Sequence, residues 1–187
     1  LKREARADES LTGSIDTLLE AVNWLGFHAR WALWFLKVSV YGGKPDQKWI
    51  DPSPLLEKSM DEFRILAGDH PMSLVFLPPP SDIEVCTDGS FVSMIAHSLL
   101  VCILENSSNC REIELSVESR GDYWTFTIDS KGDSVPADCL STQRQPDSRN
   151  MSFVLGWKLT EELGGTISTF SSQGKSTRMV IRLRTSG

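Results

Sequence analysis

The sequence predicts an α/β fold, a two-layer sandwich of one mixed sheet with helices on one face, preceded by a long dimerisation helix. Two observations carry this prediction. Apolar residues in segment 7–41 recur at helical spacing, and segment 111–130 alternates apolar and polar residues as a hairpin of half-buried strands does. We therefore expect two parts: residues 1–45 as the long helix of a helical bundle, and residues 51–187 as the α/β domain.

The long helix carries an apolar seam whose members are four and three residues apart in turn, the a/d pattern of a coiled coil. They are Leu11, Ile15, Leu18, Val22, Leu25, Ala29, Ala32 and Leu36. Because a lone helix cannot bury such a surface, we expect helix 7–41 to form a homodimer through this seam. The alternative is that the helix packs against its own domain. His28 lies beside the seam with no acidic neighbour and is interpreted as a packing or surface residue.

The elements of the domain follow from turn signals and apolar spacing. Gly42 and Gly43 end the long helix, and residues 46–52 are interpreted as a connector. In chain order we expect a helix from Asp51 or Ser53 to Ala67, strands 73–77 and 83–86, a helix over 88–106, the hairpin 111–130, a loop over 137–150, a helix over 151–163, and a hairpin of strands 166–170 and 177–183. The helix over 88–106 is apolar nearly all round, so it should be central.

Composition and charge exclude several classes of function. The net charge is −6 with a pI near 5.1 and no basic run, which argues against a nucleic-acid partner or an anionic membrane surface. The longest apolar stretch, about 91–104, is too short to span a bilayer. Neither the Cys nor the His spacing suggests a metal centre. Four cysteines without a CxxC pair indicate a reducing compartment, the cytoplasm, with an organelle stroma as the alternative.

One stretch predicts a binding site. Residues 121–136, GDYWTFTIDSKGDSVP, read as a strand that runs straight into a glycine loop. A strand that delivers a carboxylate and glycines to a ligand is a common way to build a nucleotide pocket. The residues that could do so here are Asp129, Ser130 and Gly132.

Residues 51–184 resemble the catalytic, ATP-binding domain of sensor histidine kinases, in the wider GHKL group that includes gyrase and Hsp90. The stretch LLVCILENSSNCREIELSVE is similar to the family's N box and the strand after it, and KLTEELGGTISTFSSQGKSTRMVIRL is similar to the end of the domain. Helix 7–41 with its Gly-Gly exit looks like the second helix of the dimerisation domain. The resemblance implies that the phosphoacceptor helix would precede Leu1, that His28 is not the phosphoacceptor, and that the partner is a response regulator or another signalling protein.

The family's N box carries two asparagines one helical turn apart that hold Mg²⁺ and the phosphates, and the matching positions are Cys102 and Asn106. Asn106 offers an oxygen ligand if Mg²⁺ is bound, but a thiol at position 102 suits this hard cation poorly. The family's last glycine box opens a helix where phosphates meet backbone N–H groups. Its glycines fall on Asn150 and Ser152, whose side chains would crowd that approach. The loop 137–150, which corresponds to the ATP lid, is short.

The family's first glycine box reads Asp-x-Gly-x-Gly-Ile-Pro, in which the Asp recognises the adenine amino group. Placing Asp129 on that Asp requires an inserted residue before Pro136, whereas placing Ser130 there requires none and aligns Gly132 with the first Gly. Ile128 should be buried, so strand alternation turns Ser130 toward the pocket and Asp129 away. The resemblance then implies that the adenine-binding carboxylate is absent.

These departures lead to three hypotheses. The first is a degenerate histidine-kinase-like module, a pseudokinase that dimerises and docks a signalling partner without ATP hydrolysis, with no cofactor and no catalytic residue. In it, Asn106, Ser130, Gly132 and Ser152 are vestigial ATP-pocket positions. The second is a working sensor histidine kinase that binds ATP and Mg²⁺ in an atypical pocket. The third is a structural or assembly protein that inherited the fold, because fold alone does not determine function.

Overall fold

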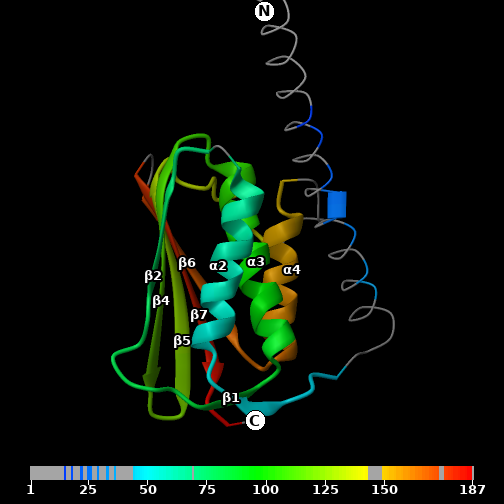
Figure 1. The fold of residues 1–187 in the computed structure, drawn as a ribbon, viewed down its shortest axis with the longest axis vertical. Helices are drawn as coiled ribbons and strands as arrows, with labels where there is room; N and C mark the ends of the chain where they lie inside the picture. The colour runs from blue at the N-terminus through cyan, green and yellow to red at the C-terminus, as the bar shows by residue number, and fades with distance from the viewer. Residues whose placement is uncertain are drawn as a thin grey trace, which may run out of the picture. The chain divides into compact units, whose positions relative to one another are not determined.

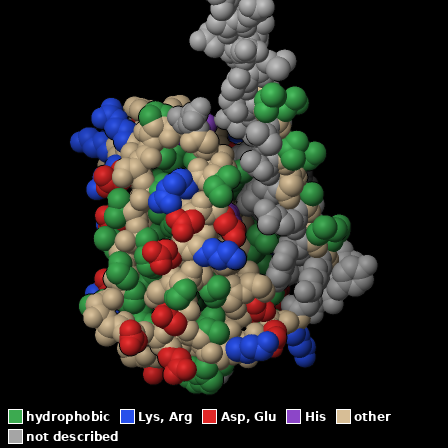
Figure 2. Space-filling view, viewed as in Figure 1, with side chains coloured by type: hydrophobic (Ala, Val, Ile, Leu, Met, Phe, Trp, Pro, Cys, Tyr) green, Lys and Arg blue, Asp and Glu red, His purple; other side chains and the backbone are tan. Residues whose placement is uncertain are grey.

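A computed structural model of the chain describes residues 44–68, 70–142, 149–172 and 175–186, together with single residues between 15 and 36. The chain divides into two compact units, Leu1–Gly43 and Lys44–Gly187. In the first unit the described residues are helical, and the apolar side chains among them are open to solvent (Figure 2). These exposed side chains include the seam members Ile15, Leu18, Val22, Leu25 and Leu36. Leu11, Ala32 and His28 lie outside the described residues.

The second unit is a two-layer sandwich in which three helices cover one face of a mixed sheet (Figure 1). The helices are α2 (Ser53–Ala67), α3 (Gly89–Asn106) and α4 (Met151–Glu162). The sheet has five strands in the order β2 (Ser73–Leu77), β4 (Cys110–Arg120), β5 (Tyr123–Gly132), β7 (Ser176–Arg184) and β6 (Thr166–Ser172). The β2–β4 pair is parallel and the other pairs are antiparallel. The predicted fold class is confirmed.

Helix α3 forms the centre of the core, packed against α2 and α4, because its sequence is apolar nearly all round. Asp88 caps its first turn and accepts hydrogen bonds from the backbone N–H groups of Ser90 and Phe91, at 2.9 and 3.3 Å. By length and composition α3 could also cross a membrane. However, 61% of that stretch is buried inside the domain, as in the core helix of a globular protein.

Several strands differ from the prediction, and β1, β3 and β5 do so most clearly. The expected connector contains β1 (Lys48–Ile50), which pairs with β3 (Val85–Thr87) in a sheet of its own, with Lys48 opposite Thr87. The strand expected over 83–86 is therefore β3, shifted by pairing toward its C-terminal side and separate from the main sheet. Strand β5 also continues beyond its expected end at residue 130 to Gly132, because β4 and β7 flank it on both sides.

The distribution of charge on the surface agrees with the prediction made from composition. On the face that Figure 2 shows, Lys and Arg side chains are scattered among Asp and Glu rather than gathered into a basic patch. Most ion pairs among the described residues are exposed, such as Lys58 with Glu62 and Arg64 with Asp61, and such pairs contribute little to stability.

Candidate functional site

Strand β5 places Ser130 and Asp129 on opposite faces of the sheet, as its alternation predicts. Ser130 is fully buried on the helix-covered face, and its hydroxyl donates a hydrogen bond to the Thr177 carbonyl at 3.2 Å. Asp129 lies on the open face, where it accepts a hydrogen bond from Arg178 Nε at 2.7 Å. The position that resembles the adenine-binding carboxylate thus holds a hydroxyl that is already engaged with the chain's own backbone.

Thr177 is a second buried polar residue at this place, and no sequence motif singled it out. Its Oγ1 accepts a hydrogen bond from the backbone N–H of Val135 at 2.8 Å, and both residues are fully buried. Thr177 lies directly opposite Ser130 in the β5–β7 pair. It therefore holds the segment after β5 against β7, which closes the space beside Ser130.

The backbone at the end of β5 requires a glycine at position 132. Its φ is +127°, and a Cβ on it would lie 2.0 Å from the carbonyl oxygen of Asn109. The next residue, Asp133, accepts a hydrogen bond from the Ser107 hydroxyl through its carbonyl at 2.7 Å. The glycine is therefore needed because the loop after β5 runs against the turn that follows α3. In this arrangement it does not present its backbone to a ligand.

The C-terminal end of α3 meets the start of α4, and this contact involves two of the predicted site residues. Asn106 Nδ2 donates to the Cys102 carbonyl and to the Arg149 carbonyl, both at 2.9 Å. Ser152 donates from its hydroxyl to Glu105 Oε2 at 2.8 Å. The side chains at both positions are thus engaged within the chain, and Glu105 is a partner that the motif comparison missed.

Cys102, at the other N-box position, is fully buried. Burial raises the pKa of its thiol far above the ordinary value, and the nearby Glu105 carboxylate adds to this effect. The thiol therefore stays protonated and offers no ligand for Mg²⁺. In the part of the chain that the structure describes, no group of three or more His, Cys, Asp and Glu side chains is placed to hold a metal ion.

The first turn of α4 is closed by side chains. Asn150 is 2% exposed and Ser152 5% exposed, where the resemblance places glycines. Asn150 Nδ2 donates to the Ser141 carbonyl at 3.4 Å, and Arg149 pairs with Asp138 at 3.4 Å. These contacts hold together the two ends of the segment that resembles the lid, whose residues 143–148 lie outside the described part.

Taken together, the described groups do not suit ATP and Mg²⁺. Such a pocket needs a carboxylate facing the adenine, oxygen ligands for the metal, and open N–H groups at a helix start. This chain has at those places a buried hydroxyl, a protonated thiol and two buried side chains: Ser130, Cys102, Asn150 and Ser152. Asn106 keeps an amide oxygen near the site, and it is the residue of this set best suited to bind a ligand.

Comparison with known proteins bears on the fold. A scan against protein-family models gave no match, and a search of curated proteins gave none. Among solved structures, the histidine kinase AdeS of Acinetobacter baumannii aligns with a TM-score of 0.69 at 17% identity, over 90% of this chain and 82% of that one. The catalytic domain of the histidine kinase ThkA aligns with a TM-score of 0.64 at 13% identity, over 76% of this chain and 99% of that one. Another form of that domain gives 0.63 at 14% identity. The α/β unit of this chain therefore has the fold seen in these histidine-kinase catalytic domains.

Proposed function

We propose that this chain is a degenerate histidine-kinase-like signalling module, a pseudokinase that dimerises and docks a signalling partner without hydrolysing ATP. The burial of Ser130 is the observation that carries this proposal. Ser130 is 0% exposed and donates to the Thr177 carbonyl, so no ligand can touch its side chain without a rearrangement of β5 and β7. The side chains of Asn150 and Ser152 support the same conclusion at the phosphate end.

Dimerisation is supported by the apolar seam of the first unit. Leu18, Val22 and Leu25 are each more than 60% exposed in a single chain. Burying a side chain of this size is worth about 1.5–3 kcal/mol, and a second copy would bring an identical seam to cover it. Light scattering tests this: the full chain should be a dimer, and a variant with Leu18→Asp and Leu25→Asp should be a monomer. A dimer that survives both substitutions would refute the seam as the interface.

The partner we propose is a receiver domain of a response regulator or another signalling protein, and the compartment is the cytoplasm. Both proposals rest on the fold likeness, and the second also on four cysteines that form no disulfide. Titration of a purified receiver domain against the dimer tests the docking. If no receiver domain or signalling protein binds, the chain is better described as an assembly protein that inherited the fold.

Isothermal titration calorimetry with a non-hydrolysable ATP analogue and Mg²⁺ tests the loss of nucleotide binding. We expect no saturable binding up to millimolar nucleotide. The alternative, a working kinase with an atypical pocket, is favoured by one feature, the half-buried Asn106 at the end of α3. Under that alternative the analogue would bind at micromolar concentration and Asn106→Ala would weaken it. Ser108→Ala is the matched control, since Ser108 lies two residues further on and is exposed.

A further inference from the structure

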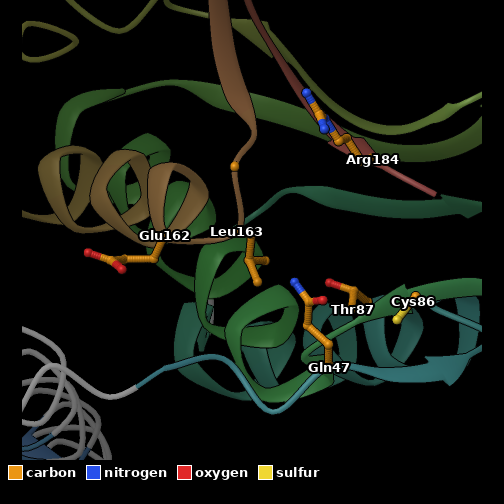
Figure 3. A pocket seen from close by; sticks show the side chains of 7 residues that line it. Gln47, Cys86, Thr87, Glu162, Leu163 and Arg184 are labelled. Atoms are coloured by element: carbon orange, nitrogen blue, oxygen red, sulfur yellow. The ribbon is translucent and has the colours of Figure 1, made fainter. Parts of the chain in front are cut away.

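A cavity of about 280 Å³ lies at the C-terminal end of α4, at the opposite end of this helix from the positions discussed above (Figure 3). Helix α4 has 12 residues, which corresponds to about 18 Å. The cavity is bordered by Leu163 and Gly164 after α4, by β3, by the residue before β1 and by the end of β7. None of the predicted ATP-pocket positions, Asn106, Ser130, Gly132 and Ser152, is among its lining residues.

Two neutral polar side chains meet in this cavity. Thr87 is 3% exposed, and among the described residues its hydroxyl has no hydrogen-bond partner. The amide of Gln47 likewise has no partner in the described part of the chain. Figure 3 shows the polar ends of both side chains beside Leu163 in the middle of the cavity. The Thr87 hydroxyl itself is not fully buried, so water or a ligand in the cavity can supply its hydrogen bond.

Two side chains of opposite charge belong to the cavity lining. Glu162 lies on the α4 side, with its carboxylate directed away from Gln47 and Thr87, and Arg184 lies on the β7 side (Figure 3). Neither has an ion-pair partner among the described residues, and both are exposed, so each can turn toward a bound molecule. The C-terminal end of a helix carries partial negative charge, which adds to that of Glu162 and favours a cation on this side.

We propose that this cavity binds a small zwitterion of the α-amino-acid type. Its carboxylate would pair with Arg184, its ammonium group with Glu162 and the end of α4, and its remaining polar atoms with Gln47 and Thr87. The small volume of the cavity and its single basic residue, Arg184, argue against nucleotides and polyphosphates, which need more space and more positive charge. No aromatic residue lines the cavity, so a flat apolar ligand would find no stacking surface.

A ligand in this cavity would restrict the motion of the connector, residues 46–52. Gln47 precedes β1 directly, and β1 is held to the domain by its pairing with β3. A ligand that joins Gln47 to the end of α4 would reduce the opening of the β1–β3 pair. Hydrogen exchange of residues 46–50 should therefore slow when the cavity is filled.

The first test is binding by the full chain. Thermal-shift measurements with each of the twenty amino acids at millimolar concentration should identify at least one that raises the Tm, and calorimetry should then give its affinity. Arg184→Gln and Glu162→Gln should each weaken that affinity about tenfold or more, because each removes one charged partner. Arg178→Gln, on the same strand but paired with Asp129, should leave the affinity unchanged. Thr87→Val should weaken it with little change in side-chain volume.

The second test reports on the cavity itself. Cys86 lines it and is half-exposed, whereas Cys102, Cys110 and Cys139 are buried, so a maleimide should alkylate Cys86 first. The bound amino acid should slow this alkylation with the same concentration dependence as calorimetry gives. The proposal is overturned if no amino acid slows it, or if the affinity is unaltered in Arg184→Gln and Glu162→Gln. Equal binding of N-acetylated or amidated analogues would overturn the zwitterion assignment. Neither test involves ATP or dimerisation, so its failure leaves the pseudokinase proposal standing.

Discussion

Helix α4 meets the rest of the domain differently at its two ends. At the N-terminal end, Ser152 donates to Glu105, and the preceding backbone accepts a hydrogen bond from Asn106. At the C-terminal end, Thr87 and Gln47 border a cavity without partners among the described residues. The first end holds Asn150 and Ser152, where the sequence resemblance predicted a nucleotide site, and the second lies away from the predicted positions.

The difference shows what a binding site requires beyond its fold. A polar group can bind a ligand only if it is accessible and not already satisfied by the protein. At the N-terminal end of α4 the polar side chains are hydrogen-bonded to other groups of the chain. At the C-terminal end, Thr87 and Gln47 have no hydrogen-bond partner among the described residues.

The largest loss of stability should come from substitution of Gly132, which lets the loop after β5 pack against the turn that follows α3. Gly132→Ala places a Cβ 2.0 Å from the Asn109 carbonyl oxygen at a φ of +127°, and we expect a loss of about 4 kcal/mol or more in the free energy of unfolding. Gly121→Ala is the matched control: its φ is +61° and nothing lies within 4 Å of the added Cβ, so about 1 kcal/mol should be lost. Urea denaturation measures both, and equal losses would contradict the close approach.

The next effect separates the two faces of β5. Ser130→Asp puts a carboxylate at a fully buried position beside a carbonyl oxygen, and we expect a loss of about 3 kcal/mol. Asp129→Ser, one residue earlier on the open face, removes an ion pair with the exposed Arg178 and should cost less than about 1 kcal/mol. A stable Ser130→Asp variant that gains ATP binding would show instead that this face is a working pocket.

A smaller effect depends on pH and involves Asp88, which caps α3. Burial raises the pKa of Asp88, but hydrogen bonds from Ser90, Asp46 and Phe91 outweigh it and hold the pKa below its ordinary value. A lowered pKa in the folded state contributes stability at neutral pH, and this contribution is lost as pH falls below about 4 and through the folded-state pKa.

Asp88→Ala should therefore lose about 1 kcal/mol at pH 7, as expected for a missing cap, and less at pH 3. Denaturant titrations of both proteins at the two pH values measure the difference. An equal loss at both pH values would mean that the charge of Asp88 has no part in the cap.

The smallest effect is expected at the cavity. Glu162→Gln and Arg184→Gln alter exposed side chains with no ion-pair partner among the described residues, so the free energy of unfolding should change by less than about 0.5 kcal/mol. Thermal denaturation of the ligand-free chain measures this. A large destabilisation would show that these two side chains stabilise the fold and are not free to bind a ligand.

Much of the fold could be predicted because local periodicity specifies it. The apolar spacing of α3 and the alternation of β4 and β5 appear in short windows of sequence, and the structure confirms these elements. Strand β1 could not be predicted in this way. It is three residues long, and Trp49 and Cys86 face each other in a pair whose members lie far apart in the chain. Its stability comes from that pairing rather than from its own composition.

The sequence by itself determined the seam of the long helix and the opposite directions of Ser130 and Asp129, since both follow from the geometry of a single element. The tertiary structure alone decided that Ser130 donates to Thr177, that Asn106 reaches the Arg149 carbonyl, and that Thr87 meets Gln47 at an open cavity. Each of these depends on two elements brought together by folding. Whether a polar side chain is satisfied or available is therefore a property of its neighbours in space, which residue spacing does not record.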